Sequence, residues 1–373
     1  MADGINQYPF YCPRFWHGMT PRPWWQLLKQ GRFGITLPRA PMAIGISIAT
    51  LFNLTFAWIE SILMRGRIRR AQLHGPVIFI VGHWRSGTTL LHELLVRDKR
   101  FSSPSTFQCF APSHFLVTEW FFRRFARWML PGKRPMDNMT AGWDRPQEDE
   151  FALVNLGLPS PYRRLAFPAE GPVDMEYLDF EGVSKDNIEH WVTNLRNFLL
   201  RVSAATERPL VIKSPTHTGR VAYLAKAFPQ AKFVHLTRDP RALYPSTCRL
   251  WASLDEAQRL QDVAPESHSD YVLDCLQRMY SAFHQQRQQI PAKNLIDLRY
   301  EDLVRDPVES MAKIYGTLRL ADFETVRGDL QTWVEEEHRD YQPNTHALDE
   351  ETESRLRERW SHYYERYGYG ESN

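Results

Sequence analysis

Residues 76–89 of the chain read PVIFIVGHWRSGTT. The apolar run at residues 77–81 has the length and the β-branched content of a buried parallel strand. Gly82 then opens a turn, and residues 88–95 continue with the spacing of an amphipathic helix. This order of strand, glycine-containing loop and helix aims backbone N–H groups and the positive end of a helix dipole at one point. We therefore expect an anion site here.

The loop is close to the nucleotide-binding pattern G-x-x-x-x-G-K-[ST], but it lacks the lysine. Gly82 and Gly87 have the right spacing, and Thr89 fills the Ser/Thr position. Thr88 stands where the lysine belongs, and the cation of the loop is Arg85 instead. A nucleoside triphosphatase needs that lysine and a metal ion to hold its phosphates. A less charged transferring group, such as a sulfuryl group, suits this loop better and needs no Mg²⁺. A P-loop kinase-like phosphotransferase is the less favoured alternative.

Two further apolar runs end in charged residues that we place beside this loop. The first run, at residues 208–213, ends in Lys213. The second, at residues 232–237, leads into Arg238, and the hydroxyl of Ser246 follows eight residues later. In a doubly wound sheet the carboxyl ends of the strands line one ligand crevice. We therefore predict an α/β fold in which a parallel β-sheet is flanked by helices, with right-handed crossovers and two anion sites at the strand ends.

These motifs resemble those of sulfotransferases that use 3′-phosphoadenosine 5′-phosphosulfate (PAPS). The segment VGHWRSGTTLL at residues 81–91 looks like their 5′-phosphosulfate loop, with Trp84 in the usual proline place. Arg238 followed by Ser246 looks like their 3′-phosphate motif. A YEDL segment like that at residues 300–303 recurs in the family. The closing Gly-x-x-Gly-x-x-Lys segment of the cytosolic aryl enzymes is absent, so the resemblance is to the bacterial and tyrosylprotein-like branch.

The resemblance implies a PAPS-dependent sulfotransferase with a P-loop-type fold and helical additions at both ends. It implies contacts with the donor from Arg85, Ser86, Gly87, Thr88, Thr89, Arg238, Ser246 and Tyr300. No metal ion is expected. We expect an N-terminal arm and apolar helix at residues 1–74, a sulfotransferase domain at residues 75–320, and a C-terminal helical extension at residues 321–373. A non-catalytic nucleotide-binding scaffold is a further alternative, and the intact Lys213 weighs against it.

Four residues are candidates for the chemistry of transfer. Lys213 matches the lysine of a family Lys-x-Pro segment that contacts the transferring group. The resemblance implies a glutamate as general base, and residues 144–150 read DRPQEDE, although such a segment can also simply start a helix. Glu148 and Glu150 cannot share a helix face, and we favour Glu148 because it lies on the turn after the proline. His217 is another candidate, because an unperturbed imidazole titrates near neutral pH.

The composition is that of a globular protein without a strong overall charge. The 373 residues are 43% hydrophobic and 24% charged, and the formal net charge is +2. This small charge argues against a nucleic-acid partner. The four cysteines show no metal-binding spacing. Residues 1–40 have no clear period and no secretory signal pattern, and we expect them to form an irregular arm packed on the domain.

An uncharged stretch at residues 42–59 precedes a basic cluster at residues 65–70. Its length is at the lower limit for a membrane span, and polar residues interrupt it. Two interpretations stay open: a buried or interfacial helix over residues 42–64, or a true span with the arginines on its cytoplasmic side. Both leave the catalytic domain in the cytoplasm, where it would associate with the membrane through this helix.

A second unusual segment, residues 101–145, crowds aromatic side chains together with Arg123, Arg124 and Arg127. Either its aromatic face joins the core, or it forms an acceptor pocket or a membrane-contacting surface. Together with residues 42–59, the segment favours a hydrophobic or lipid-linked acceptor. The acceptor classes that fit the motifs are a small molecule, a lipid or a glycan with a free hydroxyl or amine.

Overall fold

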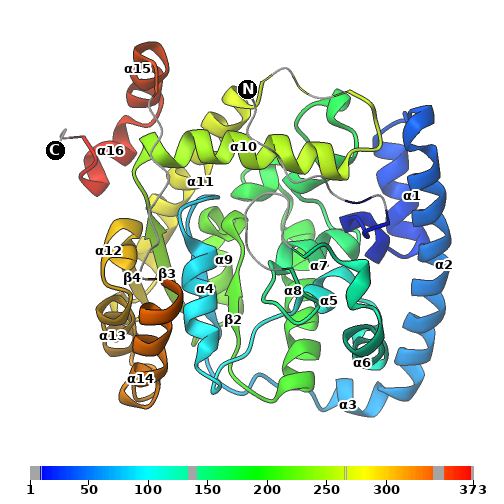
Figure 1. Ribbon diagram of the computed structural model, residues 1–373, viewed down its shortest axis with the longest axis horizontal. Helices are drawn as coiled ribbons and strands as arrows, with labels where there is room; N and C mark the ends of the chain where they lie inside the picture. Colours follow the sequence, from blue (N-terminus) through cyan, green and yellow to red (C-terminus); the bar gives the residue numbers. More distant parts are fainter. Residues whose placement is uncertain are drawn as a thin grey trace.

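Four parallel strands form the centre of the protein in the computed structural model, which describes residue 9 and residues 11–132, 141–263, 265, 267–338 and 348–370. The strands lie in the order β2-β1-β3-β4. Their bounds are Ile78–Val81 for β1, Val211–Lys213 for β2, Lys232–Thr237 for β3 and Leu295–Arg299 for β4. The predicted α/β fold, a parallel sheet flanked by helices, is confirmed (Figure 1).

Helices surround the sheet on both faces and extend from it at both ends of the chain (Figure 1). Their bounds are Pro21–Gln30 (α1), Ala40–Leu63 (α2), Arg65–Arg69 (α3), Thr88–Arg97 (α4), Thr106–Phe110 (α5), Phe115–Phe125 (α6), Asp149–Asn155 (α7), Lys185–Thr206 (α8), Val221–Ala227 (α9), Pro240–Gln258 (α10), Ser269–Gln286 (α11), Tyr300–Arg305 (α12), Pro307–Leu318 (α13), Glu324–Trp333 (α14), Glu350–Arg359 (α15) and Ser361–Tyr367 (α16).

The side chains of β1 divide between two hydrophobic cores, one on each face of the sheet. Ile78 and Ile80 pack with apolar residues of α4, α13 and α14. Phe79 and Val81 point the other way, into the larger core with residues of α8, α10 and α11. All four side chains are fully buried. Burial on both faces explains why the strand reads as a continuous apolar run without polar alternation.

The N-terminal region contains a helix that the sequence did not reveal. The expectation of an irregular arm was wrong at α1, which begins at Pro21 and buries Trp24 and Leu27 against the core. Its two prolines lie in the first turn, where a missing N–H costs nothing because it has no partner within the helix. The sequence did not predict this helix, because its Pro, Trp and Arg residues make the helical spacing of apolar side chains hard to recognise.

The long helix α2 lies along one edge of the molecule (Figure 1). It buries only a narrow stripe of residues. Its buried residues are Ala43, Ile46, Thr50, Asn53 and Glu60, which recur at helical spacing. Of the 18 consecutive residues that are most apolar within Leu37–Leu63, only 22% are buried. The aromatic segment after α4 is divided in the same way: Phe107, Phe115 and Trp143 join the core, whereas Trp120 and Phe121 are exposed.

Candidate active site at the strand ends

The loop between β1 and α4 has a backbone that only glycine fits at two positions. Gly82 has φ +145° and Gly87 has φ +94°. A Cβ atom at Gly82 would lie 2.4 Å from the carbonyl oxygen of Leu236, and one at Gly87 would lie 2.2 Å from the ring of Tyr300. The loop is therefore clamped between β3 and α12, and it presents the first turn of α4, whose N–H groups have no partner within the helix.

The residues expected to bind the 5′ and 3′ ends of the donor contact one another at the edge of the sheet. Arg85 donates from Nε to Ser246 Oγ at 2.9 Å. Arg238 donates from Nη1 to the carbonyl oxygen of Arg85 at 2.9 Å, and its guanidinium lies 4.3 Å from the centre of the Tyr300 ring. Five of the residues named for the donor (Arg85, Gly87, Arg238, Ser246 and Tyr300) therefore form one contiguous group of contacts.

Ser86, Thr88 and Thr89 complete the loop. The hydroxyl of Ser86 is turned inward and donates to the carbonyl oxygen of His83 at 2.7 Å, so it braces the loop. Thr88 is buried and Thr89 half-buried at the start of α4. The backbone N–H of Ser86 also donates to the carbonyl oxygen of His83, at 3.2 Å, so both polar groups of Ser86 brace the loop and the first turn of α4 is left to face a ligand.

The C-terminal helices also contribute to this site, which the sequence did not indicate. Tyr363 in α16 accepts a hydrogen bond from the backbone N–H of Arg238 at 3.0 Å and donates one to its carbonyl oxygen at 3.1 Å. Tyr363 is buried. A tyrosine in a polar terminal segment gave no signal by itself, because its partner lies 125 residues away.

A buried ion pair joins the end of β2 to the start of α7. Lys213 Nζ lies 2.7 Å from Glu148 Oε1, and 2% of Lys213 and 8% of Glu148 are exposed. Lys213 is opposite Ile80 of β1, so the pair is adjacent to the strand from which the loop leaves. Among the candidate acids, Glu148 is the one that the structure places beside the lysine.

The other oxygen of Glu148 is held by a chain of hydrogen bonds from the loop. Trp84 Nε1 donates to the hydroxyl of Tyr162 at 2.6 Å, and that hydroxyl donates to Glu148 Oε2 at 2.8 Å. Burial and the nearby carboxylate charge raise the pKa of Tyr162 well above its ordinary value, so the phenol keeps its proton. Trp84, which replaces the family proline, thus links the loop to the carboxylate. Tyr162 had no motif that could have identified it.

Glu150 and His217 lie in a separate, fully buried network. Glu150 forms a bidentate pair with Arg220, at 2.8 and 3.2 Å, and accepts from Thr216 Oγ1 at 2.9 Å. Burial alone would raise the pKa of Glu150, but the charge and hydrogen bonds of Arg220 outweigh burial and lower it. His217 Nε2 lies 2.8 Å from Asp149 Oδ2. The three consecutive carboxylates therefore have three different partners, and only Glu148 pairs with Lys213.

Two histidines near the loop are held neutral. Burial lowers the pKa of His83 to about 3, against a weaker opposing effect of the Trp84 carbonyl. Burial and the positive charge of Lys213 lower the pKa of His92 to about 3. These imidazoles therefore contribute no positive charge near neutral pH, whereas Arg85 in the loop, Lys213 at the end of β2 and Arg238 after β3 are cations.

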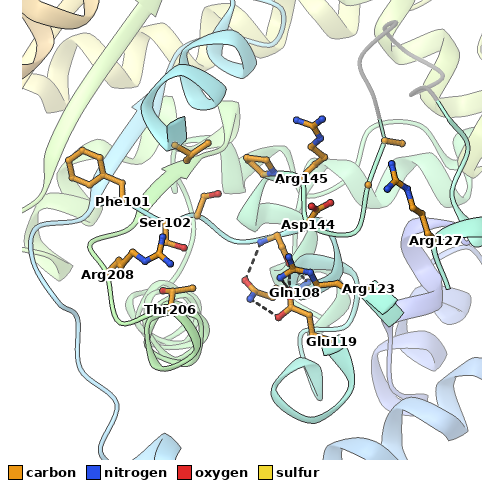
Figure 2. A pocket seen from close by; sticks show the side chains of 16 residues that line it. Phe101, Ser102, Gln108, Glu119, Arg123, Arg127, Asp144, Arg145, Thr206 and Arg208 are labelled. Atoms are coloured by element: carbon orange, nitrogen blue, oxygen red, sulfur yellow. Dashed lines mark hydrogen bonds and ion pairs between the residues drawn. The ribbon is translucent and has the colours of Figure 1, made fainter. Parts of the chain in front are cut away.

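Figure 2 shows a hollow that is separate from the candidate active site. It has a volume of about 580 Å³ and is lined at one side by Phe101, Ser102 and Arg208, and at the other by Arg123 and Arg145. Ser102 bridges to Leu210, the residue before β2, so the hollow lies at the amino end of that strand. The candidate site is at the carboxyl ends.

Comparisons with known proteins identify the family of the chain. A model of the sulfotransferase family matches residues 76–325. The omega-hydroxy-beta-dihydromenaquinone-9 sulfotransferase Stf3 of Mycobacterium bovis is 37% identical over 368 residues, which are 99% of this chain and 94% of the relative. A protein of the same description from Mycobacterium tuberculosis matches equally well.

Two solved structures share the fold over nearly the whole chain. Sulfotransferase STF9 from Mycobacterium avium has a TM-score of 0.66 at 17% identity and covers 93% of this chain and 92% of its own. Sulfotransferase STF1 from Mycobacterium tuberculosis has a TM-score of 0.60 at 17% identity, with 95% and 94% covered. The sulfotransferase interpretation therefore holds over the kinase and scaffold alternatives, and the chain belongs to the sulfotransferase family.

Proposed function

We propose that this sulfotransferase uses PAPS as its donor and transfers the sulfuryl group to a hydroxyl of a lipid acceptor. The observation that carries the proposal is the convergence at the strand ends: the β1–α4 loop, the cations Arg85 and Arg238, and the Lys213–Glu148 pair. A donor with a phosphosulfate at its 5′ end and a phosphate at its 3′ end needs two anion sites on one sheet. An ordinary mononucleotide would leave the second site unused.

For the donor, we assign the 5′-phosphosulfate to the N–H groups of Arg85 and residues 87–89 and to the guanidinium of Arg85, with Ser86 bracing the loop. Arg238 and Ser246 bind the 3′-phosphate, and the Tyr300 ring stacks against Arg238 and fixes its plane. The Arg85–Ser246 hydrogen bond connects the two ends of this donor site. The scheme needs no metal ion, since arginine and lysine side chains supply the positive charge.

For the transfer, the acceptor oxygen attacks sulfur while the bond between sulfur and the bridging phosphate oxygen breaks. Glu148 takes the proton of the acceptor hydroxyl as general base. Lys213, with Thr88 or Thr89, stabilises the charge that develops on the bridging oxygen, which leaves with 3′-phosphoadenosine 5′-phosphate. Glu150 and His217 are less suitable bases, because Arg220 and Asp149 already hold them in the buried network.

For the acceptor, the relative Stf3 is named for a hydroxylated menaquinone. We infer the same acceptor class, a hydroxyl carried by an apolar molecule, for this chain. The exposed apolar side chains of α2 and α6 support a lipid over a water-soluble glycan or an amine. The reaction would then take place at the cytoplasmic face of a membrane, in the compartment where PAPS is normally made.

The donor assignment is tested by calorimetric binding of 3′-phosphoadenosine 5′-phosphate without added metal. Arg238→Ala should weaken binding about 10- to 100-fold, because it removes charge-assisted hydrogen bonds to a phosphate. The matched control is Arg241→Ala, three residues further on, since Arg241 is paired with Asp239 and should leave the affinity unchanged. A wild type that ignores this ligand and binds ATP with Mg²⁺ would overturn the assignment.

The acceptor assignment is tested separately with sulfur-labelled PAPS and cell extract. Label should appear in the organic phase after extraction, and Lys213→Ala should abolish it. Label found only in water-soluble saccharides would overturn the lipid acceptor and leave the donor assignment intact.

A further inference from the structure

Exposed large apolar side chains are concentrated on one part of the surface. Ile48 and Trp58 in α2 are 65% and 66% exposed, and Trp120 in α6 and Trp128 just after it are 73% and 69% exposed. Among the described residues, the exposed large apolar side chains outside residues 25–63 and 120–128 are Tyr11 and Val263. Such a concentration is typical of an interaction surface, whereas isolated exposed apolar residues are ordinary.

The two helices form one continuous surface, which we call the α2–α6 face and define as the outward apolar side chains of residues 44–63 and 120–128. A series of ring contacts links the helices: Phe52 lies 6.4 Å from Phe122, which lies 5.8 Å from Phe121, which lies 5.3 Å from Phe125. The backbone N–H of Leu116 in α6 also donates to Glu60 of α2 at 2.7 Å. The face is therefore a single patch.

Polar contacts hold α2 flat on the domain along its length. Asn53 Nδ2 donates to the carbonyl oxygens of His17 and Met19, at 2.7 and 2.8 Å. Glu60 is buried and paired with Arg201 of α8. A membrane-spanning α2 would have to break these contacts and take a carboxylate into lipid. An interfacial helix keeps them, because only its outward face enters the bilayer.

The charges around the face fit an anionic surface. Residues 40–70 contain Glu60 as their sole acid and four exposed arginines that follow α2, at positions 65, 67, 69 and 70. Residues 115–129 contain Glu119 as their sole acid, together with Arg123, Arg124 and Arg127. Figure 2 shows Arg123 and Arg127 beside the hollow that Arg145 and Arg208 also line, so that four arginines surround two acids there, Glu119 and Asp144. The whole chain has a net charge of only +2, so this basic character is local.

We infer that the α2–α6 face docks on the surface of an anionic lipid bilayer, with its aromatic and aliphatic side chains among the acyl chains and its arginines at the headgroup phosphates. The inference gives the proposed function its partner and rests on that function for the lipid acceptor. The face is joined to the catalytic segment: Glu119 of α6 accepts from Gln108 Nε2 at 2.9 Å, and Pro104 accepts from the N–H of Gln147 at 2.9 Å. Docking therefore positions Glu148 relative to the bilayer through α5 and α6.

Flotation of the full chain with vesicles tests this surface. Vesicles of phosphatidylcholine with phosphatidylglycerol should carry the protein, and pure phosphatidylcholine vesicles should carry much less. The variant Ile48→Glu with Phe125→Glu should bind at least about tenfold more weakly, because two apolar side chains no longer enter the lipid. Its matched control, Thr317→Glu with Gln331→Glu, adds the same charge to exposed positions of α13 and α14 at the opposite edge and should bind like the wild type (Figure 1).

Three outcomes would overturn the inference. The first is equal flotation of the face variant and the wild type. The second is equal binding to neutral and anionic vesicles, which would remove the role of the arginines. The third is a wild-type dimer in light scattering that the face variant dissociates, without flotation of either protein, since a second copy would then be the partner. Calorimetry of the same proteins with 3′-phosphoadenosine 5′-phosphate should give equal affinities, and a failure there bears on the donor assignment alone.

Discussion

At the strand ends, Trp84 and Tyr162 are buried and each forms a hydrogen bond with its polar atom, whereas on the α2–α6 face Trp58 and Trp120 are 66% and 73% exposed. Both regions combine aromatic rings with arginines. In the first, Trp84 and Tyr162 form a chain of hydrogen bonds to one oxygen of Glu148, whose other oxygen pairs with Lys213. In the second, no described part of the chain covers the rings. The same residue types therefore lie in the proposed active site in one region and on the inferred docking face in the other, and the two regions differ in whether the aromatic rings are buried.

The largest effects should separate Glu148 from Glu150 within the buried region. Glu148→Gln should lower kcat by about 10²–10⁴-fold in the folded protein, because the acceptor proton loses its base. Glu150→Gln should instead lower the free energy of unfolding by about 3–5 kcal/mol, since Arg220 would keep a buried charge without its partner. Denaturant unfolding and initial rates measured well below both midpoints separate the two effects.

Glu148→Gln and Glu150→Gln serve as controls for each other. Each variant is an isosteric amide in the same short segment, so a general disturbance of α7 would affect both in the same way. If Glu150→Gln removed turnover while Glu148→Gln kept it, the base would have been assigned to the wrong glutamate.

Aromatic truncation should sharpen the contrast between core and face. Phe79→Ala should cost about 3–5 kcal/mol of stability, because Phe79 is fully buried and its ring lies 5.6 Å from that of Phe233. Phe125→Ala should change stability by less than about 0.5 kcal/mol, since Phe125 is 54% exposed. A large loss of stability for Phe125→Ala would mean that the face packs against the chain, and it would weaken the docking inference.

The sequence predicted the structure correctly where the order of neighbouring residues determines the local fold. The run at residues 77–81 and the glycines after it predicted β1 and its loop, and the apolar runs before Lys213 and Arg238 predicted β2 and β3. Because parallel strands bring their carboxyl ends to one edge, the grouping of Arg85, Lys213 and Arg238 followed from topology. These inferences needed only short-range patterns and one general rule.

The sequence was uninformative where partners are distant. Nothing near Tyr162 or Tyr363 indicates that one would hold Glu148 and the other Arg238, since these pairs lie 14 and 125 residues apart. Likewise, the apolar character of α2 does not say which side faces the domain. Asn53 and Glu60 decide it through contacts with His17 and Arg201, which only the fold brings near.

Acid should destabilise the buried region through its neutral histidines. His83 and His92 titrate near pH 6.5 in the unfolded chain and near 3 in the folded one. The unfolded state therefore binds protons first as the pH falls. The stabilisation is complete above about pH 6.5 and is lost progressively toward pH 3, with about 2 kcal/mol per histidine lost at pH 5.

Urea unfolding between pH 7 and pH 5 measures this linkage. His92→Gln should remove about 2 kcal/mol of the pH dependence, whatever it does to stability at pH 7. Exposed His362 offers the control, because His362→Gln should leave the slope unchanged. Equal slopes for wild type and His92→Gln would show that His92 gains its proton without unfolding.

The smallest effect concerns the hydroxyl of Tyr162, which connects the loop to the base. Tyr162→Phe keeps the ring, whose centre lies 4.9 Å from that of Phe151, and removes only the donor to Glu148. We expect kcat to fall about three- to tenfold, which corresponds to about 1 kcal/mol for one hydrogen bond. An unchanged kcat would assign Tyr162 to packing alone, since the variant keeps the ring that packs against Phe151 and loses only the hydrogen bond to Glu148.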